Sequence, residues 1–145
     1  MVEHIWQYYN EKLIEFTAMT PEKQKELMSN YEMDYSTELM IYAYDNFDTM
    51  KLLLISAGGT RYENFLHELV EKEIESTHSF MKCMEKMGMK VAEFNPYFEH
   101  TITSGMFNSL FELIVHDVPV EEALECSKEI CKFYQAGWSA CMGLK

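Results

Sequence analysis

Four side chains that could bind a metal ion or a charged ligand lie close together in LHELVEKEIESTH: His67, Glu71, Glu75 and His78. In a helix, spacings of four, four and three residues place side chains on one face. Glu75 and His78 also have the Glu-x-x-His spacing of carboxylate-bridged di-iron bundles. The line is therefore a solvated stripe, half of a metal site, or the polar lining of a ligand pocket.

A similar pair occurs further along the chain, in NSLFELIVHD. Glu112 and His116 are four residues apart and share a helical face, with Asn108 one turn earlier. Glu112 stands among apolar residues, where an unpartnered carboxylate would be costly to bury. We expect this pair to face Glu75 and His78 across a pocket, or, as the alternative, to bind a divalent metal ion with them.

Aromatic and methionine side chains are frequent, with 14% aromatics and 12 methionines, and many fall between residues 35 and 50. Such side chains usually form core, but methionine and tyrosine also line adaptable pockets. Both interpretations remain open for this segment. The predicted pocket consists of Tyr42, Phe47, Glu71, Glu75, His78, Asn108, Glu112 and His116.

No enzymatic motif is recognisable in the chain. Gly-x-Ser-x-Gly, a phosphate-binding loop and His-Glu-x-x-His are all missing from the sequence. The four cysteines, at positions 83, 126, 131 and 141, form no Cys-x-x-Cys pair. They are interpreted as small buried hydrophobic residues rather than zinc ligands. We expect a binding protein and not an enzyme.

The composition indicates one domain with an acidic surface. The chain has 145 residues, 48% of them hydrophobic, and a formal net charge of −12. Such a charge disfavours direct contact with nucleic acid or with anionic membranes. No apolar run approaches the roughly 18 residues of a membrane span, and the first residues do not resemble a signal peptide. A cytoplasmic protein without a membrane partner is expected.

Helices must position these residues, because the 6 glycines and 3 prolines provide few turns. Thr20-Pro21, Gly58-Gly59, Gly88, Pro96 and Asp117-Val118-Pro119 mark the ends of helices. The sequence predicts an all-α fold of about six helices, in an antiparallel bundle. The predicted ranges are 2–19, 21–31, 36–57, 62–87, 97–116 and 120–144.

The last two predicted helices carry more apolar surface than a small monomer covers. Ala136-Gly137 would allow two helices to approach closely. A symmetric dimer would bury this surface. The predicted dimer interface consists of Phe107, Phe111, Phe133, Tyr134 and Trp138.

Two long stretches resemble the C-terminal regulatory domain of TetR-like transcriptional repressors: GTRYENFLHELVEKEIESTHSF and FNSLFELIVHDVPVEEALECSKEICKFYQAGW. The resemblance implies a single domain over residues 1–145 that binds a small effector and forms a homodimer through a four-helix bundle of its last two helices. In this family an N-terminal helix-turn-helix reads DNA, and those helices are missing here. DNA contact would therefore occur only through that missing domain, and the effector would move the first helix.

Overall fold

Six α-helices and short connections make up the part of the chain that the computed structural model describes, residues 2–56, 58–59 and 64–143. The side chains of residues 2, 6, 13 and 25–36 lie outside this description. The all-α prediction is confirmed, and the described residues form no strand. The helices are α1 (Val2–Thr17), α2 (Pro21–Asp45), α3 (Phe47–Ser56), α4 (Phe65–Lys86), α5 (Pro96–Val115) and α6 (Val120–Met142).

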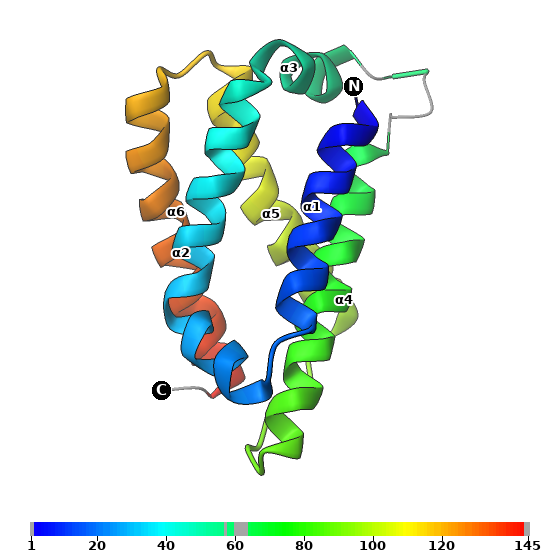
Figure 1. The fold of residues 1–145 in the computed structure, drawn as a ribbon, viewed down its shortest axis with the longest axis vertical. Coiled ribbons are helices and arrows are strands. Elements are labelled where there is room, and N and C mark those ends of the chain that lie inside the picture. The colour runs from blue at the N-terminus through cyan, green and yellow to red at the C-terminus, as the bar shows by residue number, and fades with distance from the viewer. Residues whose placement is uncertain (1, 57, 60–63, 144–145) are drawn as a thin grey trace.

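Except for α3, which lies across one end, the described helices lie roughly along the long axis of the molecule (Figure 1). α2 packs mainly against α6, and α4 packs mainly against α5, to which it is antiparallel. α1 contacts α4 and runs in the same direction. None of the described helices is long and apolar enough to cross a membrane.

The helix after Thr20 begins where the sequence predicts. The Lys23 amide donates to Thr20 Oγ1 at 3.2 Å, and Pro21 occupies the first turn. The predicted break near residues 31–36 is wrong, because the segment contains no glycine or proline and α2 continues to Asp45. The chain breaks instead at Asn46, whose Nδ2 donates to the Tyr42 carbonyl at 2.9 Å.

The other helix ends follow the predicted signals closely. α4 ends at Lys86, and Gly88 has a φ of +84°, a conformation that glycine adopts without steric cost. The turn between α5 and α6 contains Asp117, which has a φ of +56° and is bound by Lys51 of α3 at 2.5 Å. The predicted ends at positions 57, 62 and 144 lie outside the described residues.

The buried side chains form two separate clusters along the bundle. The larger one is nearer α3 and draws on all six helices, including Tyr9, Leu69 and Phe107. The smaller one lies toward the opposite end and consists of Phe16, Phe80 and Met84. The partly buried residues packed around it are Met19, Met81, Cys83, Met89 and Val91. α4 contributes to both clusters, so its middle turns lie between them.

Two predictions about buried residues are wrong. Phe107 and Phe111, predicted at a dimer interface, are only 1% and 2% exposed, because α3, α4 and α6 of the same chain cover α5. They stack on each other inside the larger cluster, with ring centroids 6.0 Å apart. Of the four cysteines, predicted to be buried, only Cys131 is, whereas Cys141 is exposed.

Candidate ligand-binding site

The structure does not bring the two predicted carboxylate–histidine pairs together. Glu112 and His116 bind each other on α5, with Oε2 and Nε2 2.7 Å apart. Their side chains are 60% and 69% exposed. Glu75 and His78 are also exposed and lie on the middle and later turns of α4. The predicted pocket between these pairs, and the alternative four-residue metal site, are therefore wrong.

The antiparallel packing of α4 and α5 explains this error. Glu71 Oε1 lies 3.2 Å from His100 Nδ1, which aligns the two helices. From Glu71, α4 continues for only about 9 Å to its first residue, Phe65, whereas Glu112 lies about 18 Å further along α5 than His100. Glu112 and His116 consequently lie beyond the start of α4.

Different residues of α5 meet the predicted line on α4. His78 Nε2 lies 2.5 Å from Glu99 Oε2, and Glu99 is buried although its partner is half exposed. Glu71 binds His100, as described above. Carboxylates and imidazoles of two helices do converge, but the partners are at the start of α5 rather than at its end.

Tyr42 and Phe47 belong to the packed interior rather than to a pocket wall. Tyr42 stacks face to face on Tyr8 of α1, with ring centroids 4.0 Å apart. Phe47 packs against Tyr44 at 5.4 Å. All are half-buried side chains packed against the larger cluster, so the alternative interpretation as core is the one that the contacts support.

Asn108 and Glu75 point away from the interior. Asn108 is exposed, and its Nδ2 donates to the Ser104 carbonyl of the same helix at 2.8 Å. Glu75 is exposed and pairs loosely with Lys72, at 3.8 Å. Glu75 is nevertheless part of a groove, unlike Asn108.

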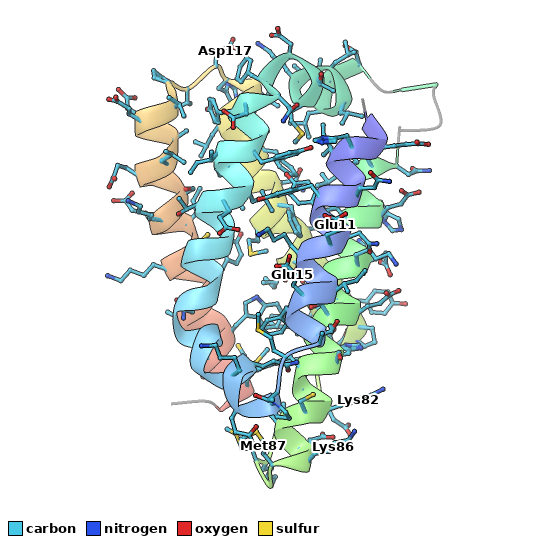
Figure 2. All side chains as sticks on the ribbon, in the orientation of Figure 1. Glu11, Glu15, Lys82, Lys86, Met87 and Asp117 are labelled. Atoms are coloured by element: carbon cyan, nitrogen blue, oxygen red, sulfur yellow. The ribbon has the colours of Figure 1, made fainter. Side chains whose placement is uncertain are left out.

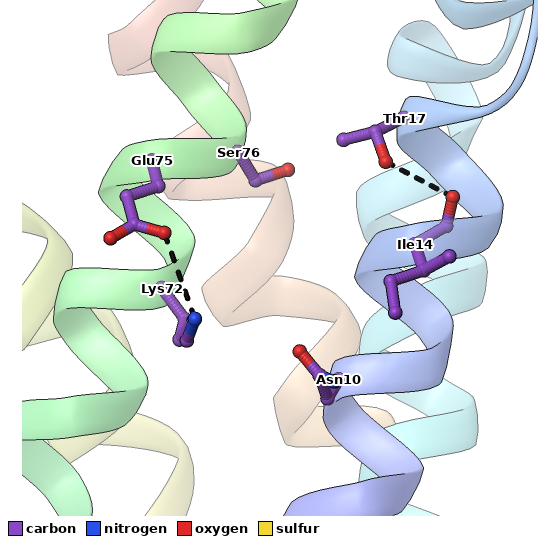
Figure 3. A pocket seen from close by; sticks show the side chains of 6 residues that line it. All are labelled: Asn10, Ile14, Thr17, Lys72, Glu75 and Ser76. Atoms are coloured by element: carbon purple, nitrogen blue, oxygen red, sulfur yellow. Dashed lines mark hydrogen bonds and ion pairs between the residues drawn. The ribbon is translucent and has the colours of Figure 1, made fainter.

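The groove to which Glu75 belongs lies between α1 and α4 and has a volume of about 280 Å³ (Figure 3). Figure 3 shows the Ser76 side chain directed across it toward α1, and the Glu75 carboxylate near Lys72. Its walls combine hydroxyl, amide, charged and aliphatic groups. The lining residues are Asn10, Ile14, Thr17, Lys72, Glu75 and Ser76.

Glu73 is the acid that α4 directs into the bundle. It follows Leu69 by four residues and precedes Phe80 by seven, and both of these are buried on the inner face of the helix. Burial raises the pKa of the Glu73 carboxyl from 4.5 to about 7. The side chain still keeps some accessible surface. The carboxyl is therefore largely removed from water, although the residue is not fully buried.

Tyr9 of α1 lies at the same level of the bundle as Glu73. Phe16 and Phe80 are in contact, with ring centroids 6.2 Å apart, and the two helices run in the same direction. Two turns earlier on each helix, and on the same faces, stand Tyr9 and Glu73. The Tyr9 hydroxyl is buried and has no hydrogen-bond partner among the described residues.

Tyr9 and Glu73 lie level with each other on α1 and α4, and we call this level of the bundle, between the two helices, the mid-bundle site. On α4 it falls between Leu69 and Val70 of the larger cluster and Phe80 of the smaller one. The buried Ser76 is on the same stretch of α4 and also lines the groove. Buried polar groups in proteins are normally paired, so an unpaired hydroxyl level with a desolvated carboxyl is typical of a site that binds a ligand.

The sequence contained a signal for Glu73 that our sequence analysis missed. Leu69, Glu73, Ser76 and Phe80 follow the spacing of four, three and four residues that marks one helical face. We instead selected the stripe of Glu71, Glu75 and His78. Glu71 and His78 bind residues of α5, and Glu75 is exposed at the edge of the groove between α1 and α4. For Tyr9, no pattern in the sequence distinguishes it from the other aromatic residues of α1.

Comparison of the chain with protein-family models, with curated proteins and with solved structures gave no match.

Proposed function

We propose that this chain is a ligand-sensing and dimerisation domain of the TetR-like type that its sequence resembles, and that its effector is a small organic cation. The observation that supports this proposal most is the Glu73 carboxyl, which is desolvated inside a helical bundle and level with the unpaired Tyr9 hydroxyl. A charged group in such surroundings is stabilised by a counterion or a donor.

A cation would satisfy both groups of the mid-bundle site. It would favour the ionised form of Glu73, and the Tyr9 oxygen could accept from an ammonium donor or from water. Tyr9 also packs edge-on against Tyr8 and Tyr42, at 5.6 and 6.3 Å between ring centroids. Aromatic faces attract organic cations. The groove beside Ser76, between the same two helices, is the proposed route of access.

The proposed response is a movement of α1 relative to α4. A ligand shifts a conformational equilibrium only by the difference in its affinity for the two states. A ligand bound between Tyr9 of α1 and Glu73 of α4 would prefer one spacing of these helices. In a TetR-like regulator this shift would be passed to a DNA-reading helix-turn-helix. The net charge of −12 argues against DNA contact by the chain itself.

The proposed dimer surface is the outer face of α5 and α6. Phe133 is 74% exposed there and borders a groove of about 290 Å³. Tyr134 and Ile130 line the same groove, with Ser109 contributed by α5. An exposed aromatic residue beside an apolar groove is a common element of protein interfaces.

The ligand proposal is tested with phenyltrimethylammonium and its neutral isostere, tert-butylbenzene. We expect the cation to raise the melting temperature and to bind in calorimetry, and the isostere to bind at least about tenfold more weakly. Glu73→Gln should remove this preference for the cation. Glu75→Gln is the comparison, because that carboxylate is exposed at the edge of the groove and not directed into the bundle.

Three outcomes would contradict the proposal. Equal binding of cation and isostere would show that charge is not recognised. Loss of binding in Glu75→Gln with retention in Glu73→Gln would show that the ligand binds in the groove lined by Glu75 and not at the mid-bundle site. No binding of either probe would argue against an organic-cation sensor.

A further inference from the structure

Three metal-binding side chains converge on the outer seam between α4 and α5: His67, Glu71 and His100. One ligand atom from each lies within 4.8 Å of the other two. His67 and Glu71 are one turn apart on α4, and His100 comes from the antiparallel helix α5. The imidazole rings of His67 and His100 are 5.4 Å apart between centroids.

The separations are close to those of a tetrahedral site. With metal–ligand bonds of about 2.0–2.2 Å, neighbouring ligands of a tetrahedral Zn²⁺ ion are about 3.3–3.5 Å apart. Glu71 Oε1 and His100 Nδ1 are already 3.2 Å apart. The ligand atom of His67 lies within 4.8 Å of both, and because this side chain is exposed, no buried packing opposes its rotation toward them.

We propose that His67, Glu71 and His100 bind one divalent transition-metal ion of the Zn²⁺ type, which joins α4 to α5. Two imidazoles and one carboxylate are a donor set that zinc uses in proteins, with a fourth position left for water. This fourth position faces solvent, since His67 and Glu71 are exposed. Imidazole donors disfavour the hard cations Mg²⁺ and Ca²⁺.

This site is distinct from the mid-bundle site and does not depend on the proposed function. Glu71 lies on the outer side of α4, toward α5, whereas Glu73 lies on the inner face. It also differs from the pair of His78 and Glu99 further along the same seam, which provides only two donors. Among the described residues, no other group of three such side chains has its ligand atoms this close.

The test is a Zn²⁺ titration of the untagged full chain against a chromophoric chelator, with Co²⁺ absorption as a second measurement. We expect one ion per chain and a tetrahedral Co²⁺ spectrum. His67→Ala, Glu71→Gln and His100→Ala should each weaken Zn²⁺ binding by at least about tenfold, since even outer partners of a metal site typically contribute about 10–100-fold. His67 and Glu71 are exposed and His100 is half exposed, so the variants should keep their helical circular dichroism.

His116→Ala is the matched control, because His116 forms the same one-turn pair with Glu112, and no described residue adds a third ligand atom to that pair. This variant should bind Zn²⁺ as the parent does. Mg²⁺ should bind neither to this variant nor to the parent. Equal weakening in His116→Ala and His67→Ala would mean scattered binding to surface histidines and would overturn the proposal. Failure of the parent chain to bind Zn²⁺ would overturn it as well.

Discussion

Glu73 and Glu75 are two positions apart on α4 and have opposite surroundings. Glu73 is on the face that carries Leu69 and Phe80, and burial raises its pKa to about 7. Glu75 is exposed and lies at the edge of the groove. Because successive positions of a helix are rotated by about 100°, neighbouring acids can have quite different chemistry.

We predict that Glu73→Gln changes the pH dependence of stability. The Glu73 pKa is higher in the folded chain than its ordinary value of 4.5. The folded state therefore binds more protons between pH 4.5 and about 7, and its free energy of unfolding falls as the pH rises through this range. The glutamine variant lacks this loss. The free energy of unfolding of the variant minus that of the parent should therefore rise by about 2 kcal/mol from about pH 5 to about pH 8.

Urea unfolding at the two pH values measures this difference. Glu75→Gln serves as the comparison, and its stability relative to the parent should stay nearly constant, because that side chain is exposed. A constant difference for Glu73→Gln as well would mean that the Glu73 carboxyl is not desolvated in the folded chain.

At the scale of packed helices, the contact between α4 and α5 includes the pair of His78 and Glu99, whose two side chains are buried to different extents. Glu99 is only 6% exposed, and its Oε2 is bound by His78 at 2.5 Å. A buried carboxylate that loses its partner bears the cost of desolvation without compensation. His78 was predicted to line a pocket, and the structure instead assigns it to the contact between these two helices.

We predict that His78→Ala destabilises the chain by about 1–3 kcal/mol, because Glu99 is left without this donor. His116→Ala removes an imidazole whose partner, Glu112, is itself exposed, so its effect should be below about 0.5 kcal/mol. Denaturant unfolding of both variants provides the measurement. Equal effects would show that the burial of Glu99 does not increase the contribution of its pair with His78 to the free energy of unfolding.

For the molecule as a whole, the proposed dimer surface is the outer face of α5 and α6, where Phe133 is 74% exposed. The predicted interface is divided by the fold: Phe107 and Phe111 are in the core, Trp138 is half-buried against Phe94 and Phe98, and Phe133 is exposed. Phe133 is consequently the residue on which the proposed dimer most depends.

We predict that the parent chain is a dimer at micromolar concentration and that Phe133→Glu makes it monomeric, because a charge would be buried at the interface. Leu52→Glu is the control. Leu52 is 61% exposed on α3, at the end of the bundle, and its substitution should leave the dimer intact. Sedimentation equilibrium distinguishes the two forms. A monomeric parent, or dissociation by Leu52→Glu alone, would contradict this surface.

Figure 2 shows the side chains on the helices in the view of Figure 1, with Glu11 and Glu15 on α1 and Lys82 toward the lower end of α4. Helices and most of their ends could be read from local patterns in the chain. Thr20-Pro21, Gly88 and Pro96 act within a few residues, so their effect does not depend on the rest of the fold. The long α2 was divided wrongly because its polar middle resembled a connection.

The amino-acid pattern was thus sufficient for the helical class and for which residues share a face of each helix, since both depend on short-range geometry. Which residues of a neighbouring helix each face meets was determined by tertiary packing. The alignment of α4 against α5 placed His100 rather than Glu112 beside Glu71, and the Phe16–Phe80 contact placed Tyr9 level with Glu73. These offsets arise from many long-range side-chain contacts together, and no local spacing encodes them.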